Sequence, residues 1–272
     1  MIILIARPPA DASASFGMQR YVMAEGFDTC QFVNSTILQA WWTGTPWYVY
    51  GTYLGGDNGA APGRGCVAMS SSTITFAISE GWALEPFWYG PQMPASCTGL
   101  SFPYLISLDT STAYDEGVAQ AQAANSAAAS FGYGTFDVIY YDMEATGSSS
   151  SCLDAAHAFV NGWDWELSAY TPYWGGLYGS TCSSQLSSFA TIPNVPYAIA
   201  PRDVNHDPTG VYGLSCLPDR RWANEQRIHQ LSAYDPLTYG GYPLTVDEDC
   251  TDGPVDTNSG ARDPFNCNHY TQ

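Results

Sequence analysis

Apolar stretches rich in aromatic and β-branched residues alternate along this chain with Ala-rich or polar stretches that have helical spacing. The first kind predicts strands and the second predicts helices. Strands are expected over Tyr21–Cys30, Trp47–Leu54, Ala83–Tyr89, Asp137–Glu144, Trp174–Gly179, Tyr197–Ala200, Arg227–Leu231 and Leu244–Asp247. Helices are expected over Ser35–Thr43, Ser71–Glu80, Ala113–Ser130, Cys152–Ala169 and Ser183–Ala190.

Regular alternation of strands and helices predicts a parallel sheet of the α/β class. Eight such strands within about 250 residues fit a closed (β/α)8 barrel, the TIM barrel, better than an open doubly wound sheet. We therefore expect a single-domain barrel over residues 21–272. Residues 1–20 are expected to be an N-terminal arm or a processing remnant, because their apolar run Ile2–Ala6 is too short for a signal-peptide core.

The charge balance narrows the range of partners. The chain has 272 residues with 8 Lys+Arg against 26 Asp+Glu, a formal net charge of −18, and it contains no Lys. Nucleic acid is not expected as a partner, since phosphate binding needs clustered basic residues. The absence of Lys excludes Schiff-base enzymes and P-loop sites. No stretch reaches the ~18 apolar residues that span a bilayer, so no membrane span is expected.

The cysteine pattern indicates an oxidising compartment. Eight cysteines without a CxxC pair favour four disulfides in a secreted or cell-surface protein over a set of buried thiols. Eight cysteines allow 105 pairings. Proximity in sequence suggests Cys66–Cys97, Cys152–Cys182 and Cys250–Cys267. The cysteines are Cys30, Cys66, Cys97, Cys152, Cys182, Cys216, Cys250 and Cys267.

Carboxylates stand at three of the expected strand ends, where TIM barrels carry their chemistry. Asp28 ends the first strand, Asp142 and Glu144 end the fourth, and Asp247 ends the eighth. Asp142 and Glu144 are two apart, so on a strand both side chains point the same way. Mutual repulsion and burial raise the pKa of at least one, which suits a general acid for glycosidic bond cleavage. The alternative is that these acids cap helices or are solvated.

Other polar and aromatic residues are weaker candidates. Trp88, Tyr89, Trp174 and Tyr178 lie near expected strand ends and could bind sugar rings, with core packing as the alternative. His229 and Gln230 lie near the end of the seventh strand, where His229 could equally be structural. Four dispersed His without an HExxH motif predict no metal site and no cofactor, and they disfavour a metal-dependent deacetylase. The acidic segment 247–253 is expected to be a solvated loop.

Several short motifs between Gly26 and about Asp252 carry a family resemblance. They are Gly26-Phe27-Asp28-Thr29-Cys30, Tyr53-Leu54-Gly55-Gly56, Gly81-Trp82 with Gly90 and Gln92, Tyr140-Tyr141-Asp142-Met143-Glu144-Ala145, Gly176-Leu177-Tyr178-Gly179-Ser180, Arg227-Ile228-His229-Gln230 and Val246-Asp247. In this order and spacing the chain resembles the bacterial Rv2525c-like, glycoside hydrolase-like domain family, whose barrel is related to family 25 lysozymes.

The resemblance implies a (β/α)8 barrel with a glycan-directed site. Lysozyme-type relatives place an Asp on strand 1, D-x-E on strand 4 and an Asp on strand 8. By that likeness Glu144 would be the proton donor and Asp142 would assist, for example by orienting a substrate N-acetyl group. Asp28 and Asp247 would position the sugar or tune the pair, and Gln92, from the third-strand pattern, is expected to bind substrate.

Two functions remain from the sequence. The first is a secreted glycoside hydrolase acting on an N-acetylhexosamine-containing polysaccharide such as peptidoglycan. The second is a non-catalytic glycan-binding or structural subunit at a cell surface, which would assemble through the N-terminal arm.

Overall fold

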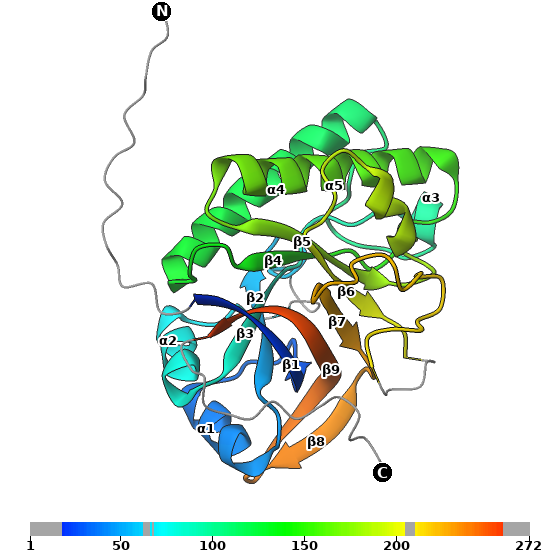
Figure 1. Cartoon of the computed structure of the whole chain (residues 1–272). Helices are drawn as coiled ribbons and strands as arrows, with labels where there is room; N and C mark the ends of the chain where they lie inside the picture. The colour runs from blue at the N-terminus through cyan, green and yellow to red at the C-terminus, as the bar shows by residue number, and fades with distance from the viewer. Residues whose placement is uncertain (1–17, 62–65, 67, 205–209, 258–272) are drawn as a thin grey trace, which may run out of the picture.

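The computed structural model describes residues 18–61, 66, 68–204 and 210–257 (Figure 1). Of the N-terminal arm expected over residues 1–20, residues 1–17 lie outside this range and residues 18–20 belong to the first strand. In chain order the elements are β1 (Met18–Asp28), α1 (Ser35–Gly44), β2 (Val49–Gly55), α2 (Ser71–Glu80), β3 (Ala83–Trp88), α3 (Ala95–Thr98), α4 (Thr110–Phe131), β4 (Val138–Asp142), α5 (Ser150–Tyr170), β5 (Trp174–Ser180), the 3-10 helix η1 (Leu186–Thr191), β6 (Ala198–Arg202), β7 (Arg227–Gln230), β8 (Asp235–Tyr239) and β9 (Tyr242–Thr257).

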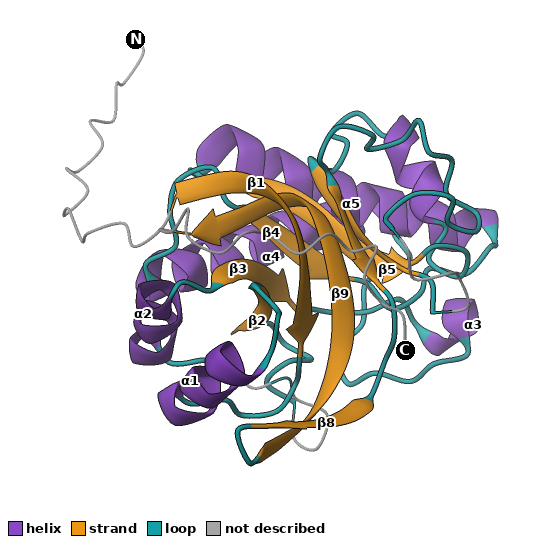
Figure 2. Ribbon diagram, turned by 60° about the horizontal axis from the view of Figure 1, so that its bottom comes forward, coloured by secondary structure: helices purple, strands orange, loops and turns teal. Residues whose placement is uncertain are grey.

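Eight strands form a closed barrel, which confirms the predicted single-domain α/β fold (Figure 2). Strands β1 to β7 pair in parallel with their neighbours in chain order. Strand β9 closes the ring between β7 and β1 and runs antiparallel to both. The eighth barrel strand is therefore reversed and much longer than the expected parallel strand Leu244–Asp247.

A β-hairpin causes this reversal. Strand β8 pairs antiparallel with β9 and lies outside the closed ring. The turn between them is Gly240-Gly241, whose φ angles of 56° and 83° fall in the left-handed region that two-residue hairpin turns require. The chain thus enters the barrel for its last strand from the opposite direction.

The expected solvated loop at 247–253 is part of β9, and this expectation was wrong. Asp249, Thr251 and Asp252 are all buried. Every residue from 249 to 257 is buried, in a strand that pairs on both sides, with β1 and with β7. Strand pairing satisfies the backbone N–H and C=O groups of an acidic segment as well as those of an apolar one. The high content of acidic residues therefore did not indicate a loop.

The helices cover the outer face of the first half of the barrel. Figure 1 shows α4 and α5 lying side by side over β4 and β5. A Cβ at Gly117 of α4 would lie 2.1 Å from the carbonyl oxygen of Phe159, so the missing side chain allows these two helices to approach closely. Asn34, Ser70, Asp109 and Ser149 cap α1, α2, α4 and α5 through side-chain hydrogen bonds.

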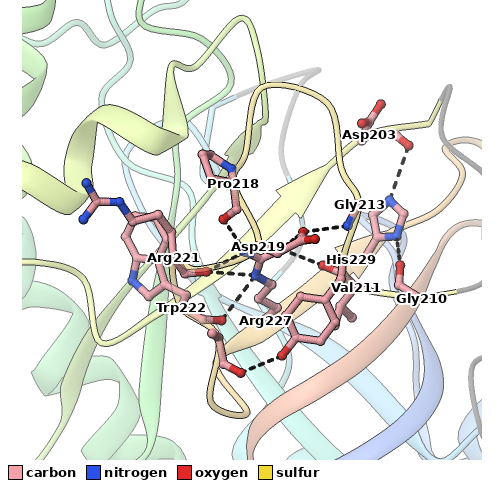
Figure 3. Close-up of polar contacts among 12 residues, drawn as sticks. Asp203, Gly210, Val211, Gly213, Pro218, Asp219, Arg221, Trp222, Arg227 and His229 are labelled. Carbon is pink, nitrogen blue, oxygen red and sulfur yellow. Dashed lines mark hydrogen bonds and ion pairs between the residues drawn. The ribbon is translucent and has the colours of Figure 1, made fainter.

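The second half of the barrel has long loops instead of helices. The helix expected over Ser183–Ala190 is the short η1, and β6 and β7 are joined by residues 203–226 without a helix among those described. Buried Arg227 holds this loop (Figure 3). Its guanidinium donates to the carbonyl oxygens of Val211 at 2.8 Å and Pro218 at 2.9 Å and lies 4.8 Å from the centre of the Tyr212 ring.

The disulfides follow a pattern different from the predicted one. They are Cys30–Cys66, Cys97–Cys152 and Cys182–Cys216, so the predicted pairs Cys66–Cys97 and Cys152–Cys182 were wrong. The remaining predicted pair, Cys250–Cys267, includes a residue outside the described range. Each observed disulfide joins the segment after one parallel strand to the segment after the next, namely β1 with β2, β3 with β4, and β5 with β6. All three therefore lie on the side of the barrel where the parallel strands end.

None of the helices in the described part of the chain is long and apolar enough to span a membrane.

Candidate active site

A cavity of about 230 Å³ lies at the rim where the parallel strands end. We call it the acidic cavity because three carboxylates, Asp142, Glu144 and Asp247, line it. Asp247 reaches this rim although it lies near the start of β9, because β9 runs in the opposite direction. The complete lining is Cys30, Tyr53, Cys66, Tyr89, Asp142, Glu144, Tyr178, Arg202, Tyr234 and Asp247.

Gln230, the last residue of β7, connects two of the predicted acids. Its Nε2 donates to Oδ2 of Asp28 at 3.2 Å and to Oδ2 of Asp247 at 3.1 Å. Its Oε1 accepts a hydrogen bond from the hydroxyl of Tyr178 at 2.9 Å. Tyr53 donates to the other oxygen of Asp28 at 3.3 Å. Asp28 is buried and does not line the cavity itself, so this network links it to the residues that do.

Asp142 and Glu144 both line the cavity, but not for the predicted reason. Strand β4 ends at Asp142, and Glu144 follows in a loop rather than on the same strand. Gln92 holds this loop: its Nε2 donates to the carbonyl oxygen of Asp142 at 2.5 Å, and its Oε1 accepts from the amide of Glu144 at 2.9 Å. Gln92 is fully buried and does not line the cavity, so its hydrogen bonds position the backbone that carries the two acids.

The environment of the acids favours their neutral forms. Burial raises the pKa of Asp142 well above its usual range, and repulsion by Glu144 adds to the effect. Burial also raises the pKa of Glu144, with Arg202 acting in the opposite direction. Burial and the charge of Asp247 raise the pKa of Asp28 to about 8. A carboxyl group of this kind can donate a proton near neutral pH.

Arg202 is the cation of the acidic cavity, and the sequence analysis did not identify it as a site residue. It is the last residue of β6, and its charge lowers the pKa of Asp142, Glu144 and Asp247. The signal was present in the sequence, because residues at the C-terminal ends of barrel strands belong to the functional rim whatever their charge.

Two tyrosines of the cavity were also missed. Tyr53 lies on β2 and was noted only within a family motif. Tyr234 precedes β8, a strand that the sequence pattern did not predict. Its amide donates to Oδ1 of Asp247 at 2.6 Å, and this bond counters the rise that burial causes in the pKa of that carboxyl.

Besides Gln92 and Gln230, described above, three more of the predicted substrate-binding residues do not line the cavity. Trp88 points outward and donates to Oε1 of Gln120 on α4 at 2.8 Å. Trp174 begins β5 and therefore lies at the opposite end of the barrel, where its ring stacks on that of Tyr197. Tyr89 and Tyr178, in contrast, line the cavity.

His229 is the third of these residues, and its ring nitrogens lie near backbone carbonyl oxygens of the β6–β7 loop, 2.7 Å from that of Gly210 and 3.3 Å from that of Asp203 (Figure 3). It precedes Gln230 on β7, and successive side chains of a strand point to opposite faces. Since Gln230 faces the acids, His229 faces the loop, and its contacts with the loop backbone give it a structural role.

No three of the His, Cys, Asp and Glu side chains in the described ranges are grouped so as to hold a metal ion.

Several solved structures share this fold. The Tat-secreted protein Rv2525c of Mycobacterium tuberculosis, in complex with L-tartrate, has a TM-score of 0.57 at 13% identity, and the match covers 85% of this chain and 96% of that one. An uncharacterized B. stearothermophilus protein has a TM-score of 0.56 at 14% identity, with 84% and 96% covered. The spore cortex lytic enzyme SleM of Clostridium perfringens has a TM-score of 0.50 at 13% identity, with 84% and 67% covered. At these identities the likeness establishes the fold alone.

The sequence itself was compared with curated proteins and with family models. No curated protein matches. A model of the Rv2525c-like, glycoside hydrolase-like domain matches residues 39–251, a range that contains Asp142, Glu144 and Asp247 and begins after Asp28. Because this range covers most of the 272 residues, the chain belongs to the Rv2525c-like, glycoside hydrolase-like domain family.

Proposed function

We propose that this protein is a secreted glycoside hydrolase that cleaves an N-acetylhexosamine-containing polysaccharide, such as peptidoglycan, with Glu144 as the general acid. The observation that carries the proposal is the position of Asp142 and Glu144, which line one cavity at the functional rim of the barrel with raised pKa values. Membership of a glycoside hydrolase-like family agrees with this chemistry.

The proposed reaction needs one proton donor and one negative charge. Glu144, protonated through burial, donates its proton to the oxygen of the scissile glycosidic bond, and the bond to the anomeric carbon breaks. Asp247, whose negative charge is favoured by the Tyr234 amide and by Arg202, stabilises the positive charge that develops on the sugar, and Asp142 orients an N-acetyl group that attacks the anomeric carbon. Water then adds to the anomeric carbon, and its proton returns to Glu144.

Secretion is part of the proposal. Three disulfides within the described residues support an oxidising compartment, which the cytosol of most organisms does not provide. The relative Rv2525c is a Tat-secreted protein. Export of this chain can be checked by detecting it in the culture medium or at the cell surface of its source.

The decisive experiment compares Glu144→Gln with the wild-type chain on a panel of cell-wall and chitin-type glycans, with mass spectrometry of the products. We expect turnover to fall by about a hundredfold or more, because the amide has no proton to donate, while glycan binding persists. Glu225→Gln is the matched control, since Glu225 is exposed and does not line the cavity. Unchanged hydrolysis in Glu144→Gln would refute the assignment of the acid. Binding without hydrolysis by the wild type would favour the non-catalytic alternative.

A further inference from the structure

Arg202 lies between two cavities. It lines the acidic cavity and also a neighbouring cavity of about 270 Å³, which we call the side cavity. The side cavity is lined by Ser180, Thr181, Cys182, Arg202, Asp203, Val204 and Ser215. Arg202 is the residue that the two linings share, so its guanidinium can contact a ligand that occupies both.

The backbone of Arg202 is fixed, whereas its guanidinium is available. Arg202 pairs with Ser180 of β5, and its carbonyl oxygen accepts the amide of Thr181 at 3.1 Å. Among the residues that the structure describes, the Arg202 side chain forms no ion pair. The ion pair found in this part of the chain joins Arg227 and Asp219. Arg202 acts on Asp142, Glu144 and Asp247 only through its charge. Within the described ranges its donors are therefore available to a substrate.

The chemistry of the side cavity suits a negatively charged group. Ser180, Thr181 and Ser215, each of which carries a hydroxyl group, line the side cavity together with Arg202. The single carboxylate of the lining, Asp203, already accepts the amide of Ser215 at 2.8 Å. A guanidinium offers parallel N–H donors in the geometry that a carboxylate accepts. The nearby acids repel a doubly charged group more strongly than a singly charged one, which favours a carboxylate over a phosphate.

We infer that Arg202 is a specificity-determining residue that binds a carboxylate carried by the substrate, and that the preferred substrate is an acidic saccharide whose charged substituent occupies the side cavity. This inference rests on the proposed function, because it assumes that the acidic cavity receives the sugar ring. It assigns the side cavity as the place where acidic and neutral glycans are distinguished.

The test is a binding experiment on the full chain in the Glu144→Gln background, so that no turnover is needed. The probes are N-acetylglucosaminyl-N-acetylmuramic acid and its methyl ester, which differ only in the negative charge, and the dissociation constants are measured by calorimetry. We expect the acid to bind about tenfold to about a hundredfold more tightly than the ester, the range for charged hydrogen bonds. Adding Arg202→Gln should remove this difference, so that the acid and the ester bind with equal affinity to within about twofold.

Two further variants separate recognition from folding. Arg202→Lys keeps the charge without the paired donors and should retain part of the preference for the acid. Arg220→Gln removes an exposed Arg outside both cavities and should retain all of it. Failure of the acid to bind, equal affinities for the two probes, or a parallel loss of both in Arg202→Gln would overturn the inference. Hydrolysis that depends on Glu144 without discrimination between acid and ester would leave the proposed function standing and reject the role of Arg202.

Discussion

Asp28 and Asp247 are register partners in the antiparallel ladder between β1 and β9, and the amide of Gln230 donates to both carboxylates. The pair stands where the barrel closes. The reversed direction of β9 brings a residue near its start to the rim formed by the ends of the parallel strands. A single side-chain amide thus fixes two acids from opposite ends of the sequence.

We predict that Gln230→Leu destabilises the fold and raises the pKa of both aspartates. The hydrogen bonds from Gln230 lower the pKa of Asp28 and of Asp247, so the loss of these bonds raises both pKa values. Two buried acceptors would lose their donor, at a cost of about 1–3 kcal/mol in the free energy of unfolding. Denaturant unfolding measures the cost, and NMR titration measures the pKa values.

Gln122→Leu is the control for this substitution. Gln122 is an exposed glutamine on α4 that donates to Glu166, so its loss should change the free energy of unfolding by less than about 0.5 kcal/mol. If the two variants were equally stable and the aspartates titrated as in the wild type, Gln230 would have no part in holding the pair.

The buried acids predict that the protein loses stability as the pH rises. Burial raises the pKa of Glu85 to about 8 from 4.5, and burial with the charge of Asp247 raises that of Asp28 to about 8 from 3.8. A folded pKa above the unfolded one means that the folded state holds more protons between the two values. The free energy of unfolding is therefore highest below about pH 4 for these groups, and it falls by up to about 1.4 kcal/mol per pH unit per group until about pH 8.

Glu85→Gln isolates one of these contributions. Glu85 lies within the sheet and accepts a hydrogen bond from the hydroxyl of Thr251, and an amide keeps its size without its charge. Denaturant unfolding at about pH 5, pH 7 and pH 9 should show a shallower loss of stability in the variant than in the wild type. Exposed Glu225→Gln should follow the wild type. Parallel curves for Glu85→Gln and the wild type would contradict the assignment to Glu85.

The first half of the barrel could be predicted from the sequence because its elements obey simple periodicities. Strands β2 and β4 read as apolar runs, and the Ala-rich spacing of α4 reads as a helix. Only residues 244–247 of the last strand were recognised, because Asp249, Asp252 and Asp256 are buried in the part that follows. Hydropathy assigns such residues to solvent, and only pairing with β1, more than 200 residues away in sequence, accounts for their burial.

The convergence of three acids could be predicted from the sequence, whereas their exact positions on the strands could not. Asp142, Glu144 and Asp247 line one cavity as expected, although Glu144 lies in a loop after β4 and Asp247 lies near the start of the reversed strand β9. Trp174 lies at the start of β5 rather than its end, and His229 lies on the outer face of β7. A shift of one residue along a strand reverses the face, and proximity to a strand end in sequence does not fix that face.

The Cys30–Cys66 disulfide is expected to support both stability and the acidic cavity. It joins the segments that follow β1 and β2, and both cysteines line the cavity. Replacing both with Ser should lower the free energy of unfolding by about 2–4 kcal/mol, because the unfolded chain gains conformational entropy without the cross-link. The double substitution should also weaken glycan binding. Denaturant unfolding and calorimetry measure the two effects.

Cys97–Cys152 provides the comparison, because it joins the next pair of segments and does not line the cavity. Its double Ser variant should lose a similar amount of stability and retain glycan affinity. Equal loss of affinity in both double variants would show that the cavity depends on general stability rather than on the local disulfide.

Arg227 is expected to hold the β6–β7 loop, and Arg227→Lys tests this by keeping the charge while removing the guanidinium. Its nitrogens donate to the carbonyl oxygens of Val211, Pro218 and Trp222, an arrangement that one ammonium group cannot reproduce. We expect a loss of about 2–4 kcal/mol in the free energy of unfolding. Limited proteolysis should also cut more rapidly within residues 210–226, because the loop loses the hydrogen bonds from Arg227 that hold its carbonyl groups against the barrel.

Arg220→Lys, at an exposed position of the same loop, is the control and should change neither measurement. If Arg227→Lys resisted protease and denaturant as the wild type does, the loop would be held by the Cys182–Cys216 disulfide instead, and reduction would then be the treatment that releases it.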